Sequence, residues 1–354
     1  MESIIAIASQ FATGKVTNVE ALGNGNINRT YLVTVPEAKP FVLQQLNSNV
    51  FPEPLKIIEN LQVITSYAHQ KIGDLGCRWK MPELLPTKQQ YYYADEDNNF
   101  WRAISFIEGA ESIEEIANTQ QAVEIGRGLG IFHLLVRDIN PDLLADTLPG
   151  FHITPNYYQQ YQETLEKAKI PEITQSKYCQ RFISAREAIV NDLEQAKAAK
   201  ILPIRIMHGD PKVNNLLLDK QTKKAIAIID LDTVKPGLVH YDIGDCLRSG
   251  CNRLGEETRY WQQVEFDLEL AAAILEGYLG VTNNFISDME RTYIYEAVRL
   301  ISFELGLRFF TDYLNGNTYF KTIYPEQNLN RALVQFQLTK SIEDQEREIR
   351  KLLD

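Results

Sequence analysis

One short β segment interrupts a long helical part of this sequence, and that break most narrows the folds open to the chain. Residues 204–207, 215–218 and 225–229 are three apolar runs of strand length, joined by polar turns. Apolar residues recur at helical spacing before this segment, from residue 112 to about 200, and again after residue 240. A small group of strands set among helices is an unusual insertion, so we predict that the chemistry of the protein lies there.

The first 107 residues have a different pattern. Short runs rich in β-branched and aromatic residues alternate with polar turns, which predicts a small antiparallel sheet of five strands. These strands are expected within residues 19–47, 90–94 and 100–107. Leucine and isoleucine recur at helical spacing between residues 55 and 64, so one helix should pack on the sheet.

This change of character predicts a chain of two lobes in the α+β class. Residues 1–107 form the expected N-terminal lobe, and residues 113–354 form a larger, mostly helical C-terminal lobe. The intervening residues 108–112, which begin Glu-Gly-Ala, are the predicted hinge.

Charge and composition exclude several classes of partner. The 354 residues carry 47 acidic and 36 basic side chains, a net charge of −11, and no Lys/Arg stripe suited to nucleic acid. No run of eighteen apolar residues predicts a membrane span, and the four cysteines lack the paired spacing of a zinc or disulfide framework. We therefore expect a cytoplasmic monomer or homodimer that binds small molecules, with no nucleic-acid or membrane partner.

Acidic and amide side chains stand at the turns of the β segment. Its first loop reads His208-Gly-Asp-Pro-Lys-Val-Asn-Asn215, and its last strand ends in Ile229-Asp-Leu-Asp232. An acid and an amide are thus five residues apart in a loop that feeds a strand, and two more acids stand where the next strand ends. Hairpin geometry should bring these ends together.

These residue types fit the needs of phosphoryl transfer, which are one carboxylate for the attacking hydroxyl and oxygen ligands for a magnesium ion that binds the phosphates of ATP. We assign Asp210 as the catalytic base and as a substrate contact. Asn215 and Asp230 are the predicted metal ligands, and Asp232 is either a ligand of a second ion or an orienting group. His208 is expected to support the loop.

The same motif resembles that of the aminoglycoside phosphotransferase-like kinases, which include choline, homoserine and fructosamine kinases. The spacing His208-Gly-Asp-x4-Asn215, followed by a hairpin and Ile229-Asp230, carries the resemblance. It implies a protein-kinase-like fold, with the N-terminal lobe binding the nucleotide and the C-terminal lobe carrying the catalytic and acceptor sites.

Motifs spread over nearly the whole chain resemble more narrowly the N-acetylhexosamine 1-kinases. They are Gly23-Asn-Gly-Asn-Ile-Asn-Arg-Thr-Tyr31, Phe41-Val-Leu-Gln-Gln-Leu-Asn47, Ile229-Asp-Leu-Asp-Thr-Val234, Tyr241-Asp-Ile-Gly-Asp245 and Arg308-Phe-Phe-Thr-Asp-Tyr313. The resemblance implies that ATP and Mg²⁺ serve to phosphorylate the anomeric hydroxyl of GlcNAc or GalNAc.

A two-lobed kinase would bind its nucleotide through three parts of the first lobe. The glycine turn would let backbone N–H groups approach the phosphates, and the hinge residues Phe106, Ile107 and Glu108 would lie over the adenine. On the third strand Gln44 stands where most kinases carry a basic residue that binds phosphate, and the resemblance to the hexosamine kinases implies a glutamine there. Without that basic residue, Glu59 on the helix lacks its usual ion-pair partner. The turn residues assigned to the nucleotide are Gly23, Asn24, Gly25 and Asn26.

A mostly apolar helix, expected from about residue 289 to 314 and taken as the last long one, carries Glu304, Arg308 and Asp312 on one face. Charges on a buried helix are usually paired or functional. By resemblance, Arg308 and Tyr319 are the predicted acceptor contacts.

Other polar residues receive structural assignments. Asp242 and Asp245 flank an expected helix start, where carboxylates favour exposed N–H groups, so Asp245 and Arg248 are interpreted as scaffold. His133 and His152 show no partner pattern and are likewise interpreted as structural.

Two other readings of the sequence remain open. The same fold could phosphorylate an amino alcohol, a homoserine-like compound or an aminoglycoside. The glutamine at position 44 also permits a nucleotide-binding pseudokinase, although Asp210, Asn215 and Asp230 together argue against a dead enzyme.

Overall fold

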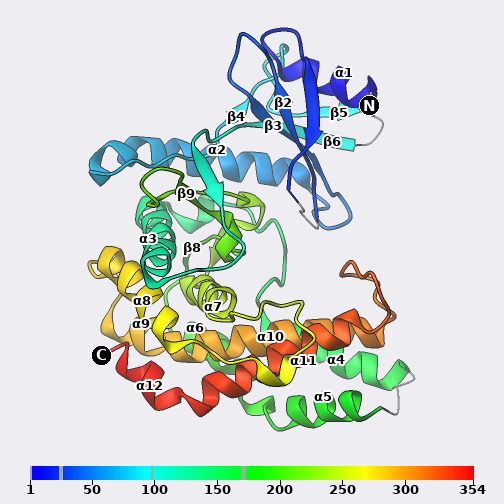
Figure 1. Cartoon of the computed structure of the whole chain (residues 1–354), viewed down its shortest axis with the longest axis vertical. Helices are drawn as coiled ribbons and strands as arrows, with labels where there is room; N and C mark the ends of the chain where they lie inside the picture. The colour runs from blue at the N-terminus through cyan, green and yellow to red at the C-terminus, as the bar shows by residue number, and fades with distance from the viewer. Residues whose placement is uncertain (1, 24–26, 97–98, 169–172) are drawn as a thin grey trace.

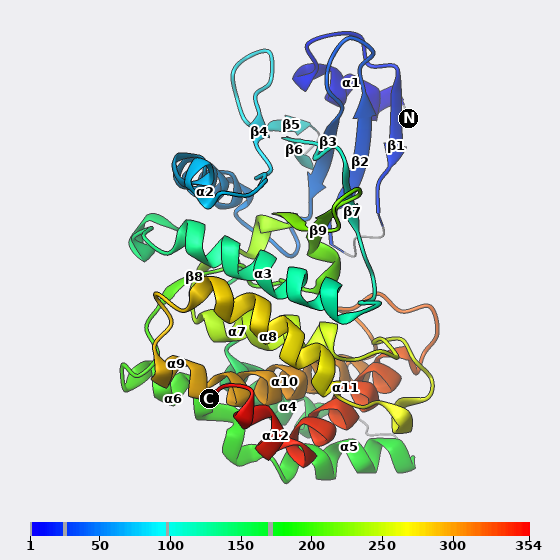
Figure 2. The ribbon, with the colours of Figure 1, turned by 60° about the vertical axis from the view of Figure 1, so that its left-hand side comes forward.

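The computed structural model describes residues 2–23, 27–96, 99–168 and 173–354. A strand-rich lobe stands above a larger helical lobe, and helix α2 lies between the sheet and the helices in both views (Figures 1 and 2). The predicted α+β class, with its antiparallel first part and mostly helical second part, is confirmed.

The N-terminal lobe contains an antiparallel sheet with the strand order β1-β2-β3-β6-β4, and β5 also pairs with β6. One short helix, α1, packs on it through Ile7, Ala8 and Phe11. The elements are α1 (Glu2–Phe11), β1 (Asn18–Ala21), β2 (Arg29–Thr34), β3 (Phe41–Leu46), α2 (Pro54–Ile72), β4 (Leu84–Leu85), β5 (Ala94–Glu96) and β6 (Asn99–Ser105).

The two faces of this sheet have different tasks. Because side chains alternate along a strand, Leu43 of β3 and Ala103 of β6 pack in the cluster that contains α1. Their neighbours Gln44 and Arg102 are directly paired across the two strands and therefore share the opposite face. That opposite face contacts the helical lobe.

Short strands form the predicted β segment of the C-terminal lobe. The hairpin β9–β10 is extended by β7, and β8 pairs with β11. One 3-10 helix, Val213–Asn215, follows the loop that contains Asp210, and another, Leu231–Thr233, follows Asp230. The strands are β7 (Ala110–Ser112), β8 (Arg205–Met207), β9 (Leu216–Asp219), β10 (Ala225–Ile228) and β11 (Lys235–Gly237).

The helices of this lobe form two packed groups. One core joins α3, α7 and α8 to the catalytic strands and to Leu61 and Ile64 of α2. A second core lies among α4–α6, α10 and α11. The helices are α3 (Thr119–Val136), α4 (Thr154–Lys167), α5 (Thr174–Ser184), α6 (Asp192–Ala198), α7 (Val239–Gly250), α8 (Leu268–Thr282), α9 (Asp288–Thr292), α10 (Ile294–Leu314), α11 (Gln327–Asp344) and α12 (Glu346–Lys351).

Three predicted details of the secondary structure were wrong. The helix expected from residue 289 is split into α9 and α10, and it is not the last long helix because α11 follows it. Residues 90–93 lie outside any strand, with φ of 68° at Gln90, and β5 begins only at Ala94. The N-terminal helix α1 was not anticipated. No helix in the described ranges is long and apolar enough to cross a membrane.

Candidate active site

The catalytic loop depends on a glycine directly before the predicted base. Gly209 has φ of 89°, which favours glycine, and a Cβ there would lie 2.8 Å from the backbone oxygen of Thr233. The hydroxyl of Thr233 donates to the carbonyl oxygen of His208 at 2.8 Å. The loop that carries Asp210 is therefore pressed against the segment that follows Asp230.

A buried carboxylate holds the backbone of this loop. Asp242 of α7 accepts hydrogen bonds from the N–H groups of His208 (2.6 Å) and Gly209 (2.8 Å), and His133 of α3 contacts it through Nε2 at 2.7 Å. Burial alone would raise the pKa of Asp242, but these bonds and the two nearby histidines hold it below its usual value. Asp242 therefore stays ionised and holds the loop.

Both ring nitrogens of His208 have hydrogen-bond partners. Nε2 contacts the carbonyl oxygen of Ile229 at 3.0 Å, and Nδ1 accepts the N–H of Asp210 at 3.2 Å. Burial lowers the pKa of His208, which favours the neutral ring that this pattern needs. The histidine joins the catalytic loop to the end of β10.

The hairpin brings Asp210, Asn215 and Asp230 to one place. The side-chain amide of Asn215 donates to the carbonyl oxygen of Asp210 at 2.7 Å, while its backbone oxygen accepts the N–H of Ile229 at 2.9 Å. Lys212 Nζ lies 2.9 Å from Asp210 Oδ2, and the charge of Asp210 raises the pKa of that lysine. Asp210 is partly exposed, as a group that meets a substrate must be.

Asp230 has the features of a cation ligand. It stands in the left-handed region, with φ of 64° and ψ of 55°, where a non-glycine residue is uncommon and often functional. Its side chain reaches solvent, but the surrounding protein displaces part of the water around it. This desolvation, together with the charges of Asp232 and Asp210, raises its pKa to about 7. A bound divalent cation would relieve this excess of negative charge.

The donor set fits Mg²⁺ that is shared with phosphates. In the described part of the chain, no group of three or more His, Cys, Asp or Glu side chains has the geometry of a metal site. Magnesium is typically bound by one or two carboxylates plus phosphate oxygens and water, and Asp230 with the Oδ1 of Asn215 supplies such a partial set. These residues could therefore hold the ion only together with the nucleotide.

Asp232 occupies a different environment from Asp230. It is buried, its Oδ2 accepts a hydrogen bond from Asn28 at 2.6 Å, and its Oδ1 is paired with Arg102 of β6. The hydroxyl of Thr147 donates to its backbone oxygen at 2.7 Å. Both carboxylate oxygens are thus engaged by the N-terminal lobe, which favours the orienting role over that of a metal ligand.

Part of the expected nucleotide contacts can be located. Gly23 is exposed and has φ of 71°, whereas Asn24, Gly25 and Asn26 lie outside the described residues. Gln44 is buried on the inner face of the sheet, where Arg102 donates to its oxygen from two nitrogens at 3.0 and 2.7 Å.

The hinge residues border an apolar patch. Ile107 packs with Leu217, Ile226 and Ala227 of the β9–β10 hairpin, and Ile229 joins the same cluster. Phe106 is partly buried and Glu108 is exposed, with the backbone oxygen of Glu108 accepting a hydrogen bond from Arg78 at 3.1 Å.

Glu59 of α2 has no basic ion-pair partner on β3, where Gln44 stands. Glu59 is exposed, and its neighbour Asn60 is buried. The amide of Asn60 donates to the backbone oxygens of Ala145 (2.8 Å) and Val234 (3.0 Å). The helix is therefore fixed to the helical lobe through an amide.

Arg308 lies among aromatic rings on α10. Its guanidinium carbon is 4.8 Å from the ring centre of Tyr157, 5.3 Å from that of Phe151 and 5.5 Å from that of Phe320. Such stacking holds the planar group in place, and the N–H donors that do not bond to Tyr319 can bind oxygen atoms. Burial alone would lower the pKa of Arg308, but the neighbouring Tyr157, Glu304 and Tyr319 raise it, in that order.

Asp312 shapes the loop that carries Tyr319. Its two oxygens accept the backbone N–H groups of Thr318, Tyr319 and Phe320 at 2.8–2.9 Å. Tyr319 remains 55% exposed, so its ring and hydroxyl are open to a ligand. The loop after α10, drawn in orange, rises from the helical layer toward the sheet lobe (Figure 1).

A second histidine–carboxylate pair, His152 and Glu304, joins the Arg308 cluster to the loop that carries Asp210. His152 Nδ1 lies 3.0 Å from Oε1 of Glu304, one turn before Arg308, and its Nε2 lies 2.8 Å from the carbonyl oxygen of Gly209. Thr154 donates to the other oxygen of Glu304 at 2.6 Å. The predicted acceptor residues are thus connected with Asp210 through two side chains.

Asp245 and Arg248 pair with each other on α7 at 2.7 Å, and both are buried. Arg248 also lies 3.4 Å from Glu256. This internal pairing agrees with the scaffold interpretation, because neither side chain is left with an open charge.

Sequence reasoning missed the contribution of Arg102, Asn28 and Lys212. Asn28 and Lys212 lie inside motifs that were recognised for other residues. Arg102 had its own signal in the sequence, because it is the one charged residue in the strand Asn99–Ser105. In the structure its side chain is only 2% exposed. A lone charge in an apolar strand indicates a buried partner.

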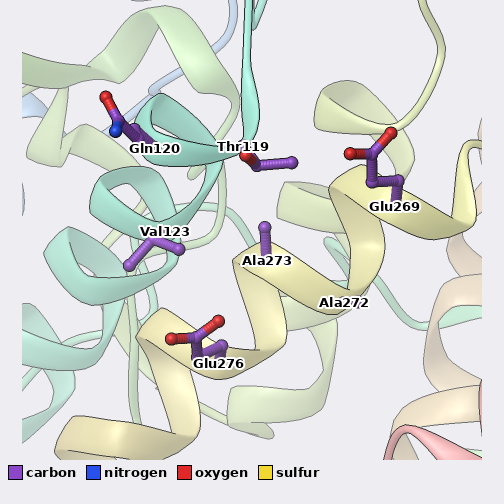
Figure 3. Close-up of a pocket in the computed structure, with 7 residues that line it drawn as sticks. All are labelled: Thr119, Gln120, Val123, Glu269, Ala272, Ala273 and Glu276. Carbon is purple, nitrogen blue, oxygen red and sulfur yellow. The ribbon is translucent and has the colours of Figure 1, made fainter.

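A surface hollow of about 260 Å³ lies between α3 and α8, bordered by Gln120, Glu269 and Glu276 (Figure 3). The two helices cross closely there, because a Cβ at Gly126 would lie 1.8 Å from the backbone oxygen of Ile274. None of its lining residues belongs to the catalytic segment. We therefore do not connect it with the chemistry.

Three solved structures share this fold over nearly the whole chain. An aminoglycoside phosphotransferase from Alicyclobacillus acidocaldarius is 14% identical, with a TM-score of 0.66 and coverage of 97% of this chain and 95% of its own. A microcompartment-associated aminopropanol kinase is 15% identical, with a TM-score of 0.67 and 98% coverage of both chains. An amicoumacin kinase, solved with AMP-PNP and Ca²⁺, is 16% identical, with a TM-score of 0.63 and coverage of 97% and 93%.

These similarities confirm the predicted two-lobed, kinase-like fold. In addition, a model of the phosphotransferase enzyme family matches residues 18–285, which include the sheet lobe and the whole catalytic hairpin. Since this match covers more than half of the chain, the protein belongs to the phosphotransferase enzyme family.

Proposed function

We propose that this phosphotransferase uses ATP and Mg²⁺ to phosphorylate the anomeric hydroxyl of an N-acetylhexosamine, GlcNAc or GalNAc. The observation that carries the proposal is the grouping of Asp210, Asn215 and Asp230 at the ends of one hairpin. A partly exposed base beside two oxygen ligands is what hydroxyl phosphorylation requires.

Each residue of the hairpin has a separate task in this proposal. Asp210 orients the sugar hydroxyl and accepts its proton while the γ-phosphoryl group is transferred, and ADP and the sugar 1-phosphate are the products. Lys212, whose Nζ lies 2.9 Å from Asp210 Oδ2, holds that carboxylate in position. Asn215 and Asp230 hold Mg²⁺, which supplies positive charge to the phosphates.

The acceptor would lie beside the aromatic group around Arg308. The guanidinium offers donors for sugar hydroxyl or acetamido oxygens, and the exposed Tyr319 offers a flat apolar surface for a sugar ring. The motif that contains Arg308 also carries the resemblance to hexosamine kinases. A cationic site of this kind suits a neutral, oxygen-rich acceptor better than an ammonium group.

An amino alcohol or aminoglycoside remains the second candidate acceptor. It is favoured by the likeness to the aminopropanol kinase, which extends over 98% of both chains. A non-catalytic nucleotide-binding role is the third reading, and the intact hairpin argues against it.

The test is ADP release with MgATP across a panel of GlcNAc, GalNAc, glucose, galactose, choline, homoserine and kanamycin. We expect turnover with an N-acetylhexosamine and none with its 1-O-methyl glycoside, whose anomeric oxygen is blocked. Turnover only with amine-bearing acceptors would replace the sugar by the second candidate. Absence of any acceptor-dependent turnover would leave the non-catalytic reading.

Two variants test the assigned roles. Asp210→Ala should abolish turnover and keep nucleotide binding, whereas Asp230→Ala should lose the Mg²⁺ dependence of that binding. The exposed Asp288 provides the control, since Asp288→Asn removes a charge outside the site and should behave as wild type. An Asp210→Ala protein with near wild-type turnover would remove Asp210 from the role of base.

A further inference from the structure

The proposed nucleotide site lacks a cation on the strand where kinases carry one. Gln44 of β3 occupies that position, and a neutral amide provides no charge for phosphates. β6 lies beside β3 in the sheet (Figure 1). The strand register places Arg102 directly opposite Gln44. Because directly paired residues share a face, Arg102 presents its charge on the same side of the sheet as Gln44.

A row of polar side chains fixes Arg102 in this position. Thr30 of β2, Gln44 and Arg102 are aligned across three neighbouring strands. The amide nitrogen of Gln44 lies 3.3 Å from the Thr30 hydroxyl, so its oxygen faces Arg102 and accepts from Nε (3.0 Å) and Nη2 (2.7 Å). A lysine at position 44 would abolish this acceptor, so the glutamine is suited to hold an arginine.

One nitrogen of the guanidinium is left to spare. Nη2 also pairs with Asp232, but Nη1 is buried and has no hydrogen-bond partner among the residues that the structure describes. An unpaired guanidinium nitrogen in a side chain that is 2% exposed is costly unless a ligand or water satisfies it.

We propose that Arg102 binds the phosphate groups of the nucleotide in place of the missing cation on β3, and that Gln44 positions it. This inference rests on the proposed function, because it assumes that a nucleotide binds between the sheet and Asp230. Guanidinium and phosphate form strong charge-assisted hydrogen bonds, and Nη1 can serve a phosphate oxygen while Nη2 keeps Asp232.

A purely structural role for Arg102 makes a different prediction. A buried ion pair that only joins β6 to Asp232 would affect adenosine, ADP and ATP equally when it is broken. A phosphate contact instead affects the gain in affinity that the phosphates add to adenosine. The ratio of the ATP and adenosine dissociation constants therefore separates the two roles without any measurement of turnover.

The experiment measures calorimetric binding of adenosine, ADP and ATP, each with Mg²⁺, to wild type and to four variants. Arg102→Gln should weaken ATP binding by about 10- to 100-fold, as loss of a charge-assisted bond does, while adenosine binding changes less than about twofold. Arg102→Lys should keep part of the gain. The exchange variant Gln44→Lys/Arg102→Gln, which places the cation on β3, should recover most of it.

Arg186 provides the matched control. It is also largely buried and paired with a carboxylate, Glu343, but lies in the helical layer, so Arg186→Gln should bind all three ligands as wild type does. If Arg102→Gln fails to fold because Asp232 is left unpaired, Arg102→Gln/Asp232→Asn removes both charges and answers the same question.

The outcomes separate failure of the inference from failure of the function. An unchanged ATP-to-adenosine ratio in the Arg102 variants, or no recovery in the exchange variant, would overturn the role of Arg102 while leaving a nucleotide-binding protein. A wild-type chain that binds none of the three ligands would overturn the proposed function itself, and with it this inference.

Discussion

Two buried histidine–carboxylate pairs hold the catalytic loop, and they differ in what else they contact. The pair His133–Asp242 accepts the loop's N–H groups and is enclosed by helices, with Tyr278 of α8 on the other nitrogen of His133 at 3.0 Å. The pair Glu304–His152 contacts the loop's carbonyl oxygen at Gly209 and borders the Arg308 cluster.

Two histidine–carboxylate pairs of the same kind thus have different roles in one site. The first pair joins the loop to a closed core, so its loss should appear as lost stability. The second joins the loop to the proposed acceptor residues, so its loss should appear in the kinetics of the acceptor.

Asp242→Ala should destabilise the protein most. It leaves His133 and two loop N–H groups without their acceptor in the interior, which typically costs about 3–5 kcal/mol. Denaturant unfolding measures this loss. Asp138→Ala, which removes an exposed partner of Lys71, is the control and should cost less than about 1 kcal/mol. Equal losses would mean that Asp242 is no anchor.

His152→Ala should separate stability from catalysis. We expect a loss of about 2 kcal/mol, because Glu304 keeps only Thr154 as partner, together with a roughly tenfold fall in kcat/KM for the acceptor. The dissociation constant for MgATP should remain unchanged. His133→Ala, measured in parallel, should lose stability and keep the acceptor KM. Similar acceptor kinetics in both variants would end the proposed distinction.

The pH dependence of stability should differ at His152. Burial alone would lower the pKa of His152, but the charge and hydrogen bond of Glu304 raise it above the ordinary 6.5, with Asp245 adding to the effect. The folded protein therefore holds this proton more tightly than the unfolded chain. The stabilisation is complete below pH 6.5 and is lost as the pH rises through the folded pKa.

Unfolding free energies of wild type and His152→Gln between pH 5 and 9 measure this effect. Their difference should shrink as the pH rises above about 6.5. A difference that grows over the same range would mean that the imidazole is neutral in the folded protein.

The smallest effects should come from the hydroxyl groups that complete each pair. Tyr278→Phe removes the contact to His133 at 3.0 Å, and Thr154→Val removes the bond to Glu304 at 2.6 Å. Each should cost about 1 kcal/mol in denaturant unfolding. Only Thr154→Val should also raise the KM for the acceptor, and a change with Tyr278→Phe alone would reverse our assignment.

The sequence predicted which polar residues would group together where those residues are close in the chain. Asp210, Asn215 and Asp230 fall within one hairpin, where short loops leave few possible geometries, and their grouping follows from strand pairing. The two lobes and the predominance of strands or helices in each could be predicted for the same reason, because periodicity is a local property.

Long-range pairings could not be predicted from the pattern. Arg102 and Asp232 are 130 residues apart, and His152 and Glu304 are 152 residues apart. Their contacts depend on how the lobes and helices pack, which no local spacing encodes. The same limit applies to Asp312, whose charge was placed correctly on a helix face but whose partners lie in the following loop.

Residues 230–234 connect the parts of the molecule in a way that restricts how the lobes can move. Asp232 is bound to the sheet through Arg102 and Asn28, the backbone oxygen of Val234 to α2 through Asn60, and Thr233 to the catalytic loop. While these bonds persist, the sheet and α2 must turn as one body. A rotation of the sheet lobe against the helical lobe would then have its axis close to this short segment, so Asp230 and Asp232 would shift less than the rest of the sheet.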